Sequence, residues 1–301
     1  MGTGALSIAA GNAILASCGG NSGTTASSNE PTEQLPSIGT ITGSGGQWHQ
    51  DGFQAGLKQL AEWGYTELQG GGNMGGMEPA EVKAFLKSLG LVSMTGSANM
   101  AALTGDESKL KTSLERSLQL EHKYVHCTWP WIGEIQGKKL DDYKVVADNL
   151  NRGGKICQSE GIQLLYHNHD FEFYPLEGQM PFEVLMAGLD SSVGIELDTY
   201  WCAKGGSSCV EYLKKYPGRY PVLHVKDMPA DVICGAAPTV FADLTEKDFC
   251  PIGSGVIDWP EIFRTNSISG AKHFIVEADK PGDDVGTFLE LSAKYLRELR
   301  F

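Results

Sequence analysis

The chain has 301 residues, of which 41% are hydrophobic, and a formal net charge of −13 at pH 7. This length and apolar content allow a large buried core in one or two domains. The acidic charge argues against nucleic acid as a partner, because an acidic surface repels phosphate backbones and the sequence has no basic patch to offset it.

Residues 1–36 differ in composition from the rest of the chain. Residues 1–17 are small and apolar, end just before Cys18 in the tetrapeptide LASC, and are followed by a stretch rich in Gly, Ser, Thr and Asn. The apolar run is too short for a membrane-spanning helix and is typical of a signal peptide. The tetrapeptide resembles a bacterial lipoprotein signal, although no basic residue precedes the apolar run. We expect an exported, periplasmic or membrane-anchored protein, lipidated at Cys18 and attached through a flexible tether. A disordered tail is the alternative.

From residue 37 onward, strand-like and helix-like segments alternate. Short apolar runs predict strands at 37–42, 65–69, 91–95, 123–128, 162–167, 193–198, 221–226 and 273–277. Helical periodicity over 50–63 and 283–299, and a helix that opens at Glu78-Pro79 and stops at Gly90, fit between them. Eight such repeats over residues 37–301 predict a single (β/α)₈ TIM-barrel domain. A doubly wound sheet is the rival, but the glycine-rich segments lack GxGxxG spacing.

The segment 228–255 is too long for an ordinary connection, and we expect it to form a wall of the site. Cys234 and Cys250 flank its irregular part. The sequence leaves open whether they form a disulfide or remain separate thiols.

Four of the predicted strands end in side chains that bind metals. These are His167, Asp198, His224 and Glu277. In a barrel the carboxyl ends of the strands share one rim, so the four side chains would surround a single point. A divalent cation would offset the cost of burying them, whereas any one of them alone is more often structural. Two imidazoles and two carboxylates suit manganese, zinc, cobalt or iron better than magnesium.

Five segments together resemble one known family. They are YHNHDFEF (166–173), ELDTYW (196–201), LHVKDM (223–228), GSGVIDWPEIF (253–263) and FIVEAD (274–279). The set is similar to the sugar phosphate isomerase/epimerase family, whose members are xylose isomerase-like TIM barrels related to family-2 AP endonucleases. The resemblance spans roughly residues 37–301 and implies one divalent metal, most often manganese, held by Glu, Asp, His and Glu.

The chain departs from the family pattern at the first of these ligands. Asp198, His224 and Glu277 match the last three, but His167 stands where the family has glutamate. The family's epimerases move a proton between their two metal-bound glutamates, so that symmetric mechanism is in doubt. The resemblance makes Glu277 a candidate base and suggests Glu172, placed where relatives often contact substrate, as another. Trp201 stands where several epimerases bind substrate with histidine.

Other candidate residues each carry an alternative. Lys226 shares a strand face with His224 and would bind a substrate oxygen, or form an ion pair with Glu196. His169 would be a metal ligand or a residue that positions a metal ligand. Further substrate-contacting candidates are Glu67, which is otherwise a solvated rim carboxylate, and His126 and Trp129 at the end of the fourth strand. His122 and His273 look like surface or helix-end residues.

These residues predict a metal-dependent carbohydrate isomerase or epimerase that works through an enediolate. A lyase or hydratase acting on 3-keto-glycosides is the close alternative, since an exported protein would not meet cytoplasmic sugar phosphates. A non-catalytic carbohydrate-binding lipoprotein is a third possibility, and the kinship with DNA-repair endonucleases is the weakest lead. The sequence leaves the oligomeric state open, including a homo-oligomer.

Overall fold

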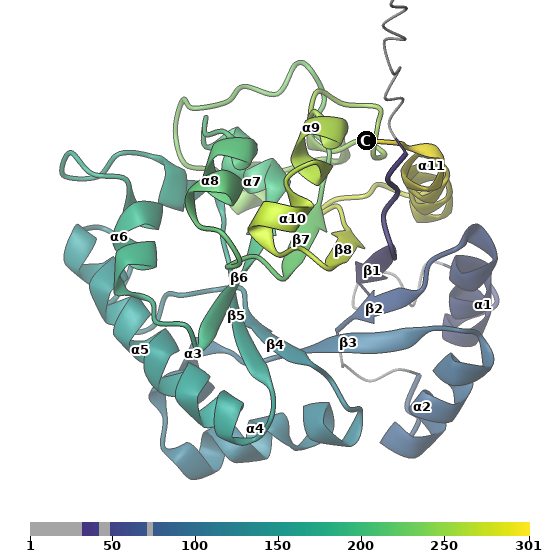
Figure 1. Cartoon of the computed structure of the whole chain (residues 1–301), viewed down its shortest axis with the longest axis horizontal. Helices are drawn as coiled ribbons and strands as arrows, with labels where there is room; N and C mark the ends of the chain where they lie inside the picture. The colour runs from purple at the N-terminus through teal and green to yellow at the C-terminus, as the bar shows by residue number, and fades with distance from the viewer. Residues whose placement is uncertain (1–31, 42–48, 71–74) are drawn as a thin grey trace, which may run out of the picture. The chain divides into compact units, whose positions relative to one another are not determined.

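A computed structural model describes residues 32–41, 49–70 and 75–301, so Cys18 and its predicted signal segment lie outside the described residues. Within the compact unit Glu33–Phe301, eight parallel strands close into a barrel in sequence order. The helices surround the strands (Figure 1). The (β/α)₈ fold and all eight predicted strands are thereby confirmed. The strands are β1 (Gly39–Ile41), β2 (Glu67–Gln69), β3 (Val92–Ser97), β4 (Tyr124–Cys127), β5 (Gln163–His167), β6 (Val193–Asp198), β7 (Val222–Val225) and β8 (His273–Val276).

Helices follow the strands around the barrel. They are α1 (Phe53–Trp63), α2 (Pro79–Ser88), α3 (Met100–Thr104), α4 (Glu107–Gln119), α5 (Leu140–Ser159), α6 (Pro181–Gly188), α7 (Thr199–Lys204), α8 (Cys209–Lys215), α9 (Trp259–Phe263), α10 (Asn266–Ser269) and α11 (Val285–Glu298), with short 3₁₀ turns η1 (Asp170–Phe173), η2 (Phe241–Asp243) and η3 (Glu246–Asp248). Helix α2 begins as predicted, with a capping box between Glu78 and Glu81 and proline in its first turn.

Two apolar layers hold the barrel together. The larger one packs the outward side of the strands against the helices. A smaller one fills the barrel interior, with members on β3, β4, β5, β7 and β8 at Met94, Tyr124, Leu165, Val222 and Ile275. The interior is tight: a Cβ on Gly39 would lie 2.6 Å from Ile275 Cδ1. The polar side chains inside the barrel therefore lie above and below this interior apolar layer.

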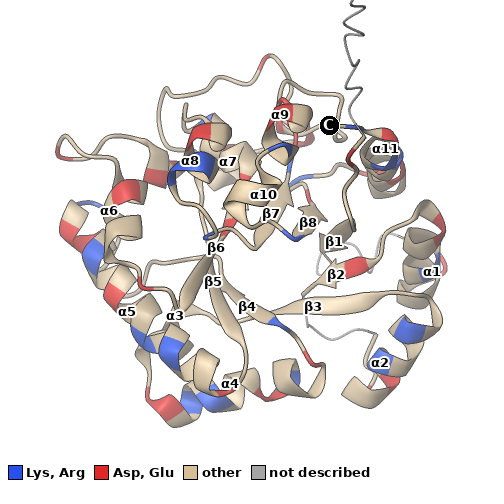
Figure 2. Ribbon diagram, in the orientation of Figure 1, with Lys and Arg blue, Asp and Glu red and all other residues tan. Residues whose placement is uncertain are grey.

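Charges of both signs are mixed on the outer helices, as α4 and α5 show (Figure 2). Among the described residues, no helix is both long and apolar enough to cross a membrane.

Candidate metal and active site

The carboxyl ends of β5 to β8 bring together the polar side chains that the sequence singled out. His167 on β5 is paired in register with Glu196 on β6, and Asp198 on β6 is paired with His224 on β7. Since alternate residues of a strand face the same side, Glu196 and Asp198 both point inward at successive levels. The site therefore has an outer layer around Asp198 and an inner layer around Glu196.

Three of the four predicted metal ligands meet in the outer layer. His167 Nε2 lies 3.6 Å from Asp198 Oδ2, and His224 Nδ1 lies 3.7 Å from the same oxygen. The three ligand atoms lie within 4.8 Å of one another, and all three residues are buried. Asp198 Oδ2 and His224 Nδ1 are buried atoms without a hydrogen-bond partner in the described part of the chain. The three side chains thus face a common point, and the two atoms are instead in ion-pair contact with Lys226 and Glu277.

The fourth predicted ligand, Glu277, stands beside this trio. Its Oε2 atom lies 2.9 Å from His224 Nδ1, and its side chain remains 14% exposed. Burial raises the pKa of Glu277, but Lys226 and His224 outweigh that effect and hold the pKa well below its ordinary value. Glu277 is therefore an ionised carboxylate at the solvent side of the cluster.

Lys226 forms ion pairs with three carboxylates at once. Its Nζ atom lies 2.9 Å from Asp198, 2.8 Å from Glu277 and 2.8 Å from Asp279. The predicted alternative, a pair with Glu196, is wrong, because Lys226 lies two residues past His224, the register partner of Asp198, and its Nζ atom contacts the outer carboxylates instead. Burial alone raises the pKa of Asp198, yet Lys226 and the two neighbouring histidines bring it down to about 2.

The donor set and charge of this cluster suit a divalent cation. Asp198, Glu277 and Asp279 share one lysine, Lys226, whereas the ion pairs of Glu196 among the described residues are with histidines. Burial lowers the pKa of His224, but Glu196, Asp198 and Glu277 outweigh that effect and hold the pKa well above its ordinary value. When all four carboxyls are ionised, Lys226 and a protonated His224 still leave two negative charges. Buried charge of this kind needs a partner, and mixed imidazole and carboxylate donors favour zinc, manganese, cobalt or iron.

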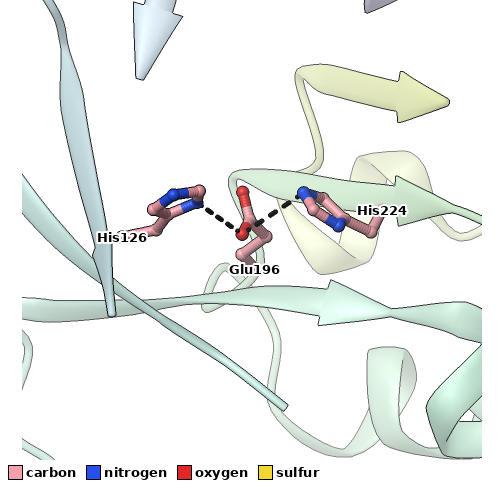
Figure 3. Close-up of side chains that lie close together, drawn as sticks. All are labelled: His126, Glu196 and His224. Carbon is pink, nitrogen blue, oxygen red and sulfur yellow. Dashed lines mark hydrogen bonds and ion pairs between the residues drawn. The ribbon is translucent and has the colours of Figure 1, made fainter. Parts of the chain in front are cut away.

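Glu196 is the centre of the inner layer and was not predicted as a site residue. Its Oε2 atom lies 3.1 Å from both His126 Nδ1 and His167 Nδ1, and 3.3 Å from His224 Nε2. Figure 3 shows the rings of His126 and His224 on either side of this carboxylate. Burial raises its pKa, but His224 and His126 outweigh that effect and hold the pKa well below the ordinary value. Gln69, also missed, completes the layer at 2.8 Å from His126 and 2.6 Å from His224.

Aromatic rings form one wall of the site. The His169 ring lies 5.1 Å from that of His167 and 5.8 Å from that of Trp201, and Phe241 of the long loop packs against both His169 and Trp201. Trp201 is fully buried, so it supports this wall without offering its face to solvent. Trp129, 5.6 Å from His169, is 48% exposed and is the ring able to stack on a sugar.

The positions of two predicted residues, Glu67 and Glu172, do not support contact with a substrate at the rim. Glu67 begins β2 and lies 3.0 Å from His273 at the start of β8, so it belongs to the opposite end of the barrel. Glu172 is fully buried, and its oxygens accept hydrogen bonds from the Tyr166 hydroxyl and the His169 backbone. Burial raises the pKa of Glu172 to about 8.

The segment 228–255 forms a wall, as predicted. Asp227 anchors it by accepting hydrogen bonds from the backbone of Gly253 at 2.8 Å and Gly255 at 3.1 Å, and from Trp259 Nε1 at 3.0 Å. A side chain at Gly255 would collide with the Asp227 carboxylate. Cys234 and Cys250 are free thiols in the structure.

Comparisons with known proteins agree with this architecture. The family model described as xylose isomerase-like TIM barrel matches residues 57–299. Inosose dehydratase of Geobacillus kaustophilus is 28% identical over 216 residues, which cover 64% of this chain and 67% of that protein. Matches to inosose dehydratases of Clostridium beijerinckii and Bacillus cereus cover only 42% and 48% of those proteins.

Among solved structures, a sugar phosphate isomerase/epimerase from Parabacteroides distasonis is 26% identical with a TM-score of 0.69, over 87% of this chain and 93% of that one. A structure described as IOLI protein with a bound zinc atom shares the fold, with 16% identity and a TM-score of 0.63 over 86% of this chain and 95% of that one.

Proposed function

The chain belongs to the xylose isomerase-like TIM-barrel family, and we propose that it is a divalent-metal-dependent enzyme that removes a proton next to the carbonyl of a small carbohydrate. The expectation that the chain is an enzyme is confirmed at the level of the family, since its relatives are named as enzymes. The observation that carries the proposal is the convergence of His167, Asp198 and His224 on one point at the barrel rim.

His167, Asp198 and His224 would hold the cation, with Glu277 beside them. When bound, a divalent cation there would polarise the substrate carbonyl and stabilise negative charge on its oxygen. Manganese is the first candidate from the family resemblance, and zinc, cobalt and iron suit the same donors.

The chain's own groups would move the protons. Glu277 is ionised and reaches the solvent side of the cluster, so it is the best-placed base for the proton on the carbon next to the carbonyl. Lys226 brings an ammonium group to the same carboxylate and would donate hydrogen bonds to a substrate oxygen that gains charge.

Elimination of water is the reaction we favour. The C–H proton would pass to Glu277, the bond to the hydroxyl on the next carbon would break, and that hydroxyl would leave as water with a proton from Lys226 or His126. Two observations support elimination. The Geobacillus relative is named inosose dehydratase, and His167 stands where the resemblance expects the glutamate that a two-carboxylate epimerase needs.

Isomerisation or epimerisation is the second candidate, supported by the name of the Parabacteroides relative. Both routes begin with the same proton removal. They differ only in whether the β-hydroxyl leaves or a proton returns to carbon.

Product analysis in deuterium oxide separates these routes. Metal-loaded protein would be incubated with inososes, 3-keto-glycosides and free ketoses, and the products followed by NMR and ultraviolet absorbance. Elimination predicts a conjugated enone or its tautomer from the first two classes. Conversion of free ketoses alone, with deuterium at the neighbouring carbon, would show isomerisation instead, and no turnover of any class with metal bound would refute the proposal.

The carbohydrate would reach the site at the cell surface or in the periplasm if Cys18 is lipidated. We keep this location as part of the proposal, because 3-keto-glycosides are substrates that an exported enzyme can meet.

A further inference from the structure

The inner layer of the site contains a second set of metal-type ligands. His126 Nδ1 and His224 Nε2 lie 3.1 and 3.3 Å from one oxygen, Glu196 Oε2 (Figure 3). These three ligand atoms lie within 4.8 Å of one another. Donor atoms roughly 2.0–2.1 Å from a tetrahedral zinc ion lie about 3.3 Å apart. Both measured spacings therefore match edges of such a coordination shell.

Hydrogen bonds do not account for the contacts around His126 Nδ1 and His224 Nε2 when the Gln69 amide is oriented as in this structure. Gln69 Nε2 lies 2.8 and 2.6 Å from these two nitrogens. An amide nitrogen only donates, so it requires both imidazole nitrogens to be bare, whereas the Glu196 carboxylate only accepts and requires both to carry a proton. With the Gln69 amide in this orientation, no protonation state of the two imidazoles satisfies both neighbours. A cation touching the imidazoles and the carboxylate, with the Gln69 oxygen turned toward it, removes the conflict.

The charge of the inner layer also calls for a cation. Glu196 is 0% exposed, and its Oε1 atom has no hydrogen-bond partner in the part of the chain that the structure describes. Lys226 pairs with the three outer carboxylates, Asp198, Glu277 and Asp279. A carboxylate that is buried without a full set of partners is costly. The His126 side chain, at 10% exposure, lies nearer the solvent than that of Glu196.

We propose that His126, Glu196 and His224 bind a second divalent cation of the zinc class inside the barrel mouth. The His224 ring then links two sites, because its Nε2 atom faces Glu196 while its Nδ1 atom faces Asp198 and Glu277. Imidazole and carboxylate donors select this class of metal over magnesium. The inference goes beyond the proposed function, which requires the rim cation alone.

Metal stoichiometry tests the inner site without relying on activity. The full chain is stripped with a chelator, reloaded with Zn²⁺, separated from free metal, and analysed for ions per chain. We expect two ions in the wild type, one in Glu196→Gln and one in Asp198→Asn. Glu183→Gln, on the exposed surface of α6, is the matched control and should retain two. Excess Mg²⁺ should displace neither ion.

The location of the ions is tested by anomalous diffraction at the zinc edge from wild-type crystals. A peak between His126 Nδ1 and Glu196 Oε2 is expected. This measurement, together with His126→Asn, decides the question even if Glu196→Gln does not fold.

Each outcome separates the inner site from the rim site. One wild-type ion that Asp198→Asn removes and Glu196→Gln keeps would overturn the inner site, and the hydrogen-bonded arrangement with the Gln69 amide exchanged would explain the contacts. One ion with the opposite dependence would support the inner site and refute the rim site of the proposed function. No bound ion would overturn both.

Discussion

Lys226 Nζ lies 2.9 Å from Asp198 Oδ2, the same oxygen that faces the imidazoles of His167 and His224. An ammonium of the protein and a bound metal ion would therefore compete for one carboxylate oxygen. Such competition would make Lys226 a determinant of metal affinity as well as a candidate proton donor.

Lys226→Met should tighten binding of the rim cation while weakening the metal-free protein. Removal of the ammonium leaves Asp198, Glu277 and Asp279 without their lysine partner, and breaking a buried pair costs about 3–5 kcal/mol of unfolding free energy. Bound metal should restore most of this loss. Calorimetric titration with Mn²⁺, and chemical unfolding with and without the metal, measure the two effects.

Lys215→Met is the matched control, because Lys215 pairs with Glu183 on the surface, where both side chains are more than 40% exposed. Its effect on stability should stay below about 1 kcal/mol. Unchanged metal affinity in Lys226→Met would contradict the competition.

Glu277→Gln should lower kcat by about 10²–10⁴-fold, the range attributed to a general base. His167, Asp198 and His224 remain as ligands, so metal content should stay near the wild-type level. Steady-state kinetics and metal analysis on the same preparation separate the two roles. Glu290→Gln on the exposed side of α11 serves as control. Full activity in Glu277→Gln would show that another residue is the base.

Glu172→Gln should flatten the dependence of stability on pH. Burial raises the folded-state pKa of Glu172 to about 8, while the unfolded chain loses this proton near its ordinary pKa of about 4.3. The folded state therefore binds more protons between these values. The contribution of Glu172 is fully present below about pH 4.3 and is lost as pH rises toward 8, by at most about 1.4 kcal/mol per pH unit.

Urea unfolding at several pH values measures this effect as a difference between wild type and Glu172→Gln, which removes the background of other titrating groups. Glu183→Gln should leave the wild-type slope unchanged. Parallel profiles for wild type and Glu172→Gln would show that Glu172 is ionised in the folded protein.

Asp227→Asn should loosen the loop wall and reduce stability by about 3 kcal/mol. The carboxylate accepts hydrogen bonds from four backbone amides, at Met228, Gly253, Gly255 and Ile257, and from the Trp259 indole. An asparagine amide would point a donor at some of these donors and leave them unsatisfied. Hydrogen exchange in residues 228–257 should accelerate, with metal content unchanged. Asp231→Asn, exposed in the same loop, should have little effect.

The sequence revealed those features that depend on local pattern. Continuous apolar runs located all eight strands, and the polar residues at their ends located His167, Asp198 and His224. The sequence did not determine whether a side chain in a three-residue strand lies at the amino or the carboxyl end of the barrel. Glu67 begins β2 and pairs with His273, whereas Gln69 ends it and reaches the site.

Residues whose partners come from distant strands were harder to predict. Glu196 is an acid inside an otherwise apolar run, which was a visible signal, but its partners His126 and His224 lie on β4 and β7. Asp279 lies past the end of β8, where no periodicity shows that it meets Lys226. His122 and His273, expected at the surface, are 4% and 7% exposed, and they are hydrogen-bonded to Ser93 and Glu67 respectively.

The alternation of residues in and after β7 makes both the candidate metal site and the anchoring of the 228–255 loop depend on the register of this strand. His224 and Lys226 face the barrel interior, while Asp227 faces the opposite way and fastens the loop. A slip of β7 by one residue would turn all three side chains to the wrong side together. A misaligned chain would therefore lack both the ligands and the wall that encloses them. A register shift of β7 would therefore not leave a pocket that has its candidate metal ligands but lacks the enclosing loop.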